Sequence, residues 1–194
     1  MSEELSERFR DAFFRTIQSG DRAEILKQAA MSANLSTWTS AITSVVVATC
    51  EAVGLKASAK GHKLELLPIH RSEYLSLDVM AFPKGEQRWR FPAAVMELEN
   101  GKRDDQIAYS LWKVMAVHAD LRAVFCYRKQ ADQATLLIRH LQEEVVGAME
   151  IIGRMALEGR TLVVVGSRDE SSTFPYGFFS WWELNTNTGK FERL

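Results

Sequence analysis

The spacing of apolar residues along the chain changes from a helical period to a strand-like one near residue 55. Before that point, apolar side chains return at every fourth position with charged residues between them, at Leu5, Phe9, Phe13 and Ile17. This spacing gathers the apolar side chains on one face of a helix. The first part of the chain is therefore expected to form three helices, over 3–19, 21–30 and 36–53.

Beyond residue 55, short apolar runs alternate with turn-forming stretches that contain proline, glycine and asparagine. Runs of this length and composition are typical of β-strands. Strands are expected over 63–67, 74–82, 88–99, 121–127, 161–165 and 174–184, with one helix that begins near 104 and a long one over 132–157. The order is three helices followed by β-β-β-α-β-α-β-β, which predicts a single α/β domain over residues 1–194.

Composition and charge narrow the class of protein. Hydrophobic residues make up 46% of the 194 residues and charged residues 25%, values that exclude a disordered, collagen-like or disulfide-stapled chain. The formal net charge of -1 means that any contact with nucleic acid must come from a local basic patch. Cys50 and Cys126 lie in apolar runs and are expected as buried free thiols. With no targeting signal and no long apolar run in the sequence, we expect a cytoplasmic protein without membrane contact.

Three acidic residues stand among apolar neighbours in the predicted strands. Asp78 lies within 74–82, and Glu97 and Glu99 lie near the end of 88–99. Because side chains alternate along a strand, the two glutamates are expected on one face, roughly 6.5–7 Å apart, and a hairpin would bring Asp78 to the same space. A divalent cation such as Mg²⁺ or Mn²⁺ would offset the cost of burying carboxylates. The alternative is that the glutamates line a solvated sheet edge while Asp78 pairs with an arginine.

The order of elements around these acids matches a known pattern. A helix, a three-stranded meander with Asp78 in one strand and Glu97-Leu98-Glu99 in the next, and then a helix and a strand resembles the PD-(D/E)xK nuclease family. The resemblance covers roughly 38–127 and implies a restriction-endonuclease-like αβββαβ core. It divides the domain into an N-terminal helical extension, a nuclease-like core, and an extra C-terminal helix and strands, over 1–35, 36–130 and 131–194 respectively.

The same resemblance implies a function and roles for the acids. The family hydrolyses phosphodiester bonds of nucleic acid with Mg²⁺, and Asp78 and Glu97 would be its metal ligands here. The last motif position is usually lysine in this family, whereas this chain carries Glu99, which would act as a third acid or a water-positioning base. Some restriction enzymes of the family also carry an acid at that position. Glu51 could be the helical acid that some members add to the metal site.

Several polar and basic residues near the motif are candidates for contact with nucleic acid, for which DNA is favoured over RNA. Gln106 and Tyr109 resemble a glutamine and a tyrosine that RecB-like nucleases carry after the motif strand, although their spacing there is wider by one. Lys102 or Lys113 could replace the missing lysine. The full set of candidates is Lys84, Arg88, Lys102, Arg103, Gln106, Tyr109 and Lys113.

Two other interpretations stay open at the level of sequence. Since Glu99 stands where a catalytic lysine is expected, the domain could be a catalytically inactive nuclease-fold module that binds nucleic acid or a protein partner. The aromatic segment over 174–182 could form the interface of a homodimer or stack against bases.

Overall fold

The computed structural model describes the chain over residues 2–194, with side chains described from residue 5 onward. Its three N-terminal helices follow the predicted ranges closely: α1 is Ser2–Gln18, α2 is Arg22–Met31 and α3 is Leu35–Ala52. The apolar stripe predicted for the first helix is buried, since Phe9 and Phe13 have no exposed surface. Burial of this stripe is what holds α1 against the rest of the molecule.

Seven strands form one mixed sheet in which the strands lie in the order of the sequence. The strands are β1 Leu55–Ala59, β2 Val79–Pro83, β3 Ala94–Leu98, β4 Leu121–Arg128, β5 Arg160–Ser167, β6 Phe179–Asn185 and β7 Lys190–Arg193. β3, β4 and β5 are parallel to one another, and the remaining pairs are antiparallel. The further helices are α4 Asp104–Met115, α5 Asp132–Leu141, a π-helical turn Gln142–Val146, α6 Ile151–Met155 and a 3₁₀ segment Arg168–Thr173. The predicted α/β class is confirmed.

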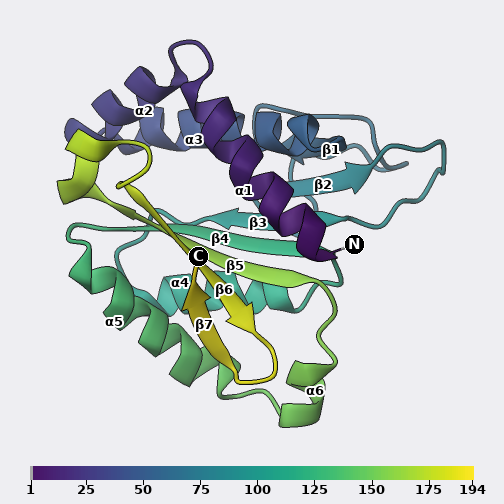
Figure 1. Ribbon diagram of the computed structural model, residues 1–194. Coiled ribbons are helices and arrows are strands. Elements are labelled where there is room, and N and C mark those ends of the chain that lie inside the picture. The colour runs from purple at the N-terminus through teal and green to yellow at the C-terminus, as the bar shows by residue number, and fades with distance from the viewer. Residues whose placement is uncertain (1) are drawn as a thin grey trace.

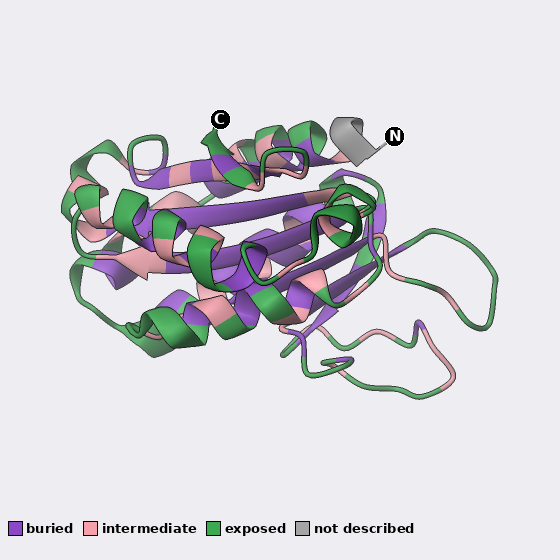
Figure 2. Cartoon of the chain, turned by 90° about the horizontal axis from the view of Figure 1, so that it is seen from below, coloured by how far each residue is buried: buried purple, intermediate pink, exposed green. Residues whose placement is uncertain are grey.

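Helices cover both faces of this sheet (Figure 1). α1, α2 and α3 lie on one face, α4 and α5 lie on the other, and each side encloses its own apolar cluster. The strands are buried between these layers, while the outer faces of α4 and α5 are exposed (Figure 2). Met96 and Leu98 of β3 belong to the cluster under α1–α3, whereas Val95 belongs to the cluster over α4. Because side chains alternate along a strand, Glu97 faces α4 as well.

Strand register brings the candidate acids to one edge of the sheet. β2 and β3 are antiparallel, and Val79 at the start of β2 pairs with Met96 near the end of β3. The connection that precedes β2 therefore lies beside the segment that follows β3. β4 and β5 run parallel to β3, so their carboxyl ends open at the same edge. Ligands bind at this edge in many sheets with parallel strands.

The first two predicted strands are placed differently in the structure. The segment 63–67 forms no strand, and the first strand is β1, which follows α3 directly after Gly54 in the left-handed conformation (φ 94°). β2 begins only at Val79, because Leu75 and Ser76 adopt positive φ angles of 54° and 55° that are incompatible with an extended strand. Local apolar alternation was therefore overridden by a tight turn before β2.

The long helix predicted over 132–157 is also wrong in its extent. The α-helix ends at Leu141, and a π-helical turn follows it. In this turn the backbone N–H of Gly147 donates to the carbonyl of Gln142 at 2.8 Å. The later apolar residues Ile151 and Ile152 are exposed rather than packed. Glycine is a poor helix former, and Gly147 follows Val146, the last residue of this region that is buried in the cluster over α4 and α5.

Most of the C-terminal aromatic segment is part of the core. Phe178, Phe179 and Trp181 are buried, and the Phe179 and Trp181 rings lie 5.2 Å from the ring of Phe13. These rings are therefore not available as a dimer interface or as a surface for bases. Cys50 and Cys126 are buried and unpaired as predicted, and burial raises the pKa of each thiol to about 12. Over residues 2–194, no helix has the length and apolar character needed to cross a membrane.

Candidate functional site

Two of the predicted acids lie side by side where β2 begins and β3 ends. The backbone N–H of Asp78 donates to Oε1 of Glu97 at 3.3 Å, and the backbone N–H of Leu98 donates to Oδ2 of Asp78 at 2.7 Å. Each carboxylate is thus held by the backbone beside the other. Glu97 is buried and Asp78 is half-buried. We call Asp78 and Glu97 the acid pair.

A lysine from α4 contacts the acid pair. The Nζ of Lys113 lies 2.9 Å from Oε2 of Glu97 and donates to the carbonyl oxygen of Ser76 at 2.8 Å. Both charged side chains of this ion pair are mostly buried, with exposed fractions of 21% for Lys113 and 7% for Glu97. The left-handed turn at Leu75 and Ser76 shapes the loop that supplies this carbonyl. Such backbone strain is retained where the surrounding structure fixes it, and it is often found at functional sites.

The environment of the acid pair favours protonation. Burial, with a smaller contribution from the negative charge of Asp78, raises the pKa of Glu97 to about 7 against the opposing hydrogen bond and charge of Lys113. Burial also raises the pKa of Asp78, against the hydrogen bond from Leu98 and the charge of Lys113. Ionising two adjacent, poorly solvated carboxylates beside a single lysine is costly, and a bound divalent cation would lower that cost.

Glu99, the third predicted acid, faces the same helix. The hydroxyl of Ser110 on α4 lies 3.4 Å from Oε2 of Glu99 and 3.5 Å from Oε2 of Glu97. The other carboxylate oxygen of Glu99 accepts a short hydrogen bond of 2.5 Å from the backbone N–H of Gly101. A Cβ atom at position 101 would lie 2.5 Å from Oε1 of Gln106 and 2.7 Å from the same Glu99 oxygen, so both flexible side chains would have to shift to accommodate it. Glu99 is therefore engaged with its own loop rather than with the acid pair.

A cavity gives access to Asp78 from the α3 side. It has a volume of about 450 Å³ and is lined by Ser36, Thr39, Ser40, Thr43, Lys60, Gly61, Glu73, Asp78 and Leu98. Glu51 does not line it: that side chain is exposed near the end of α3 and lies eight residues after Thr43, the nearest lining residue of the helix, about 12 Å along the axis. The structure therefore does not bring Glu51 to the acid pair.

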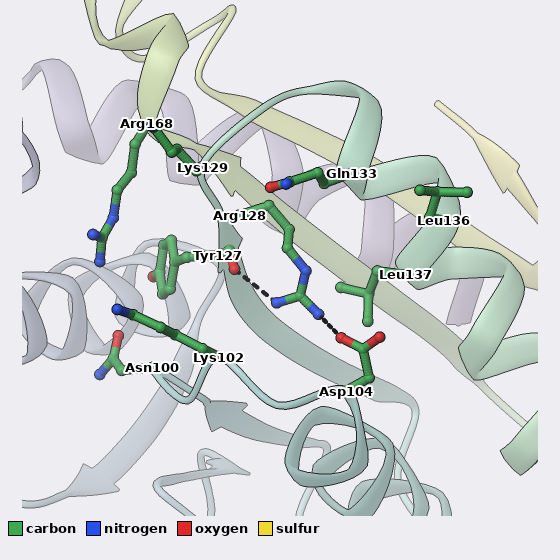
Figure 3. Close-up of a pocket in the computed structure, with 10 residues that line it drawn as sticks. All are labelled: Asn100, Lys102, Asp104, Tyr127, Arg128, Lys129, Gln133, Leu136, Leu137 and Arg168. Carbon is green, nitrogen blue, oxygen red and sulfur yellow. Dashed lines mark hydrogen bonds and ion pairs between the residues drawn. The ribbon is translucent and has the colours of Figure 1, made fainter.

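A second pocket opens at the carboxyl ends of β3 and β4 (Figure 3). We call it the basic pocket; it has a volume of about 470 Å³ and is lined by Asn100, Lys102, Asp104, Tyr127, Arg128, Lys129, Gln133, Leu136, Leu137 and Arg168. Arg128 is held by an ion pair with Asp104 and by a hydrogen bond of 2.9 Å to the carbonyl of Tyr127. Asn100 connects this pocket to the cavity at Asp78, since its Nδ2 donates to Oγ1 of Thr39 at 2.8 Å.

The structure separates the predicted nucleic-acid contacts into two groups. Lys84 and Arg88 lie in the exposed connection after β2, at the far end of that strand from Asp78, which is about 16 Å away for a five-residue strand. Lys102 lines the basic pocket, and Arg103 instead pairs with Asp105 at 3.2 Å on the surface.

The remaining candidates lie on α4. Gln106 is exposed in the first turns of the helix. The exposed rings of Tyr109 and Trp112 stack with their centroids 6.0 Å apart, and Nζ of Lys113 lies 5.8 Å from the centroid of the Tyr109 ring. An aromatic pair is thus placed beside the lysine that contacts Glu97.

Sequence reasoning did not find four of these residues. Arg128 ends β4, Lys129 follows it, Arg168 follows β5, and Ser110 lies on α4. A signal for the three cations was present, because each stands at or just after the carboxyl end of a predicted strand, where ligands bind in sheets with parallel strands. Ser110 carried no such signal, since one serine on an amphipathic helix has no distinctive pattern.

The carboxylates described above form a pair rather than a preassembled cluster. Among residues 2–194, the structure holds no group of three or more His, Cys, Asp and Glu side chains arranged to bind a metal ion. Mg²⁺, however, is commonly held by one or two carboxylates together with waters and substrate phosphates. The acid pair fits such a site in its chemistry, with a buried and a half-buried carboxylate of raised pKa, of which Asp78 lines the cavity on the α3 side.

The raised pKa of Glu97 predicts a pH dependence of stability in metal-free protein. The folded state binds a proton at Glu97 more tightly than the unfolded state, so this group contributes stability below pH 4.5 that is lost as pH rises to about 7. The free energy of unfolding is expected to fall by at most about 1.4 kcal/mol per pH unit because of this group. Urea unfolding in EDTA between pH 4.5 and 8 is expected to show a steeper decline for the wild type than for Glu97→Gln, and parallel profiles would contradict this.

Comparison with known proteins identifies no family for this chain. No model of a protein family matches the chain, and no curated protein matches it. The function must therefore be argued from the site itself.

Proposed function

We propose that this protein is a metal-dependent nuclease of the PD-(D/E)xK type, in which Lys113 serves as the lysine that the motif lacks. The observation that carries the proposal is the ion pair of 2.9 Å between Lys113 and Glu97, next to Asp78. The arrangement supplies two acids and a lysine, the chemical groups of the motif, with the lysine on a helix instead of at position 99. In this proposal α3, β1–β3, α4 and β4 form the restriction-endonuclease-like core.

Asp78 and Glu97 are the residues that would hold the cation. A bound Mg²⁺ would act as a Lewis acid toward a phosphoryl oxygen and would lower the pKa of a water. Binding requires both carboxylates to be ionised, which burial opposes and which the hydrogen bond from Leu98 to Asp78 and the ion pair of Lys113 with Glu97 partly restore. Lys113 also provides a positive charge beside the place where the scissile phosphate would gain negative charge.

Ser110 on α4 links Glu99 to the acid pair through its hydroxyl group. The Ser110 hydroxyl is within 3.5 Å of both glutamates and can donate to either of them. The hydrogen bond from Gly101 keeps the Glu99 carboxylate turned toward its own loop. Glu99 is therefore a positioning residue in this proposal, because it acts on the acid pair through Ser110.

A catalytically inactive module is the second candidate. It is favoured by one observation, namely that Lys113 already neutralises part of the charge of Glu97. In that case the acid pair and Lys113 would be a buried ion-pair network with a structural role, and the protein would bind nucleic acid or a protein without cleaving it.

Metal removal distinguishes the two candidates. Plasmid DNA, single-stranded DNA and RNA oligonucleotides are incubated with the protein in Mg²⁺, in Mn²⁺ and in EDTA, and products are resolved on gels. Cleavage is expected with Mg²⁺ or Mn²⁺, is expected to fall to background in EDTA, and should return when metal is added in excess.

Thermal unfolding provides a readout that does not need a substrate. Metal binding to the folded state is expected to raise the melting temperature of the wild type. Glu144→Gln, a change at an exposed glutamate outside the site, should behave like the wild type in both assays. If no substrate is cleaved in either metal and the melting temperature stays constant, the nuclease proposal is wrong and the inactive module remains.

A further inference from the structure

The basic pocket is an assembled feature with an excess of positive charge. Cationic side chains reach it from the loop after β3, from the end of β4 and from the 3₁₀ segment after β5. Four of its lining residues are Lys or Arg, and the carboxylate of Asp104 is paired with Arg128. Figure 3 shows Lys102, Lys129 and Arg168 around the opening, with the Arg128 guanidinium turned toward Asp104.

Backbone contacts hold these cations together despite their mutual repulsion. The N–H of Asp169 donates to the carbonyl of Lys129 at 3.0 Å, which fixes the 3₁₀ segment against the end of β4 and places Arg168 beside Lys129. Tyr127 packs against Trp38 of α3 with ring centroids 4.9 Å apart, so the back of the pocket is rigid. Gathering like charges is unfavourable unless a ligand of opposite charge neutralises them.

The size and position of the pocket indicate which anion it binds. A volume of about 470 Å³ can hold a nucleotide-sized group, and small-molecule pockets begin near 300 Å³. Asn100, at its rim, lies three residues after Glu97, so the two positions are at most about 10 Å apart along the chain. A span of this length lies within a few nucleotides of a B-form strand, whose rise along the helix axis is about 3.4 Å per nucleotide.

We propose that the basic pocket binds phosphate groups of the substrate strand on one side of the bond cleaved at the acid pair. This inference rests on the proposed function, since it places the substrate relative to Asp78 and Glu97. Lys129 and Arg168 neutralise backbone phosphates, and Gln133 adds a polar donor at the N-terminal end of α5. Contacts of this kind set the register of the strand without reading its sequence.

Binding in the absence of cleavage tests the inference separately from catalysis. A fluorescein-labelled DNA oligonucleotide, single-stranded or duplex, is titrated in EDTA with the wild type and with Lys129→Ala/Arg168→Ala, and anisotropy is followed at several salt concentrations. The variant is expected to bind about tenfold more weakly, and its slope of log K against log salt should be shallower by about 1.4–1.8, for two lost phosphate contacts.

A matched control removes the same charge elsewhere. Arg15→Ala/Lys190→Ala changes exposed cations of α1 and β7, and it should leave affinity and salt slope close to those of the wild type. Equal losses in the two double variants would overturn the inference, because the effect would then come from net charge alone. Inorganic phosphate and a mononucleotide serve as competitors. If they bind the pocket while oligonucleotide affinity is the same in wild type and variant, the pocket takes a small anion and the inference is wrong.

The outcomes also separate this inference from the proposed function. If the wild type cleaves in Mg²⁺ while the pocket variant binds and cleaves normally, phosphate binding by the basic pocket is refuted and the proposed nuclease activity is retained. A wild type that never cleaves, but whose DNA binding depends on Lys129 and Arg168, would refute the nuclease and leave a nucleic-acid-binding pocket.

Discussion

Replacing Glu97 with glutamine is expected to lower the rate of metal-dependent cleavage by at least about a thousandfold. The carboxamide has nearly the shape of the carboxylate and can still accept the hydrogen bond from Asp78, so the fold should be kept. The charge that would hold the cation is lost, and Lys113 loses its partner at 2.9 Å. Initial rates of oligonucleotide cleavage in Mg²⁺, compared at equal protein concentration, measure the effect.

Lys113→Met tests whether the Lys113 ammonium has a different role from the Glu97 carboxylate. This variant keeps both carboxylates, so it should still show the metal-dependent rise in melting temperature, whereas Glu97→Gln should lose it. Removing one positively charged donor near a reacting phosphate lowers catalytic rates by about 10²–10³. Lys113→Arg should recover part of the rate, because charge is restored on a bulkier group. Full activity of Glu97→Gln would place any cleavage outside the acid pair.

The acids of the candidate site could be found from the sequence because their placement depends on neighbouring strands. Asp78 and Glu97 stand among apolar residues in two segments joined by a short connection, and antiparallel pairing of such segments is the simplest arrangement. The structure brings the two acids together although β2 begins later, and β3 spans fewer residues, than predicted. Errors in strand boundaries did not alter the pairing.

The contact made by Lys113 could not be derived from local pattern. Sequence offered Lys102 and Lys113 as equal alternatives for the missing lysine. The choice depends on the orientation of α4 beneath the sheet and on the left-handed turn at Leu75 and Ser76, and neither residue is a glycine that would have indicated positive φ. Tertiary contacts, rather than intrinsic preference, determine such a turn.

The basic pocket was missed for a related reason. Its cations are separated by as many as 66 positions along the chain, from Lys102 to Arg168, and come together only because β3, β4 and β5 end at one edge of the sheet. The sequence predicted these strands but not their parallel order within the sheet. Strand neighbours are set by the whole fold, whereas periodicity reports only the local element.

The second large effect concerns stability. Phe13→Ala is expected to lower the free energy of unfolding by about 3–5 kcal/mol. The side chain of Phe13 has no exposed surface, and its ring lies 5.4 Å from that of Phe125 in β4 and 5.2 Å from that of Trp181 in β6. Truncation therefore removes apolar contacts with two strands at once and leaves a cavity that rigid aromatic neighbours cannot fill.

The same substitution decides whether residues 1–35 are an appended extension or part of the core. Denaturant unfolding of Phe13→Ala is compared with that of Phe14→Ala, whose neighbouring ring is only partly buried and stacks on the exposed Tyr176. The control should lose about 1 kcal/mol, the typical value for a point substitution. A loss below 1 kcal/mol for Phe13→Ala would mean that α1 is dispensable to the sheet. A large loss in one cooperative transition would mean that α1 stabilises β4, the strand whose end carries Arg128, so the helix farthest from the acid pair in sequence would support the basic pocket through packing alone.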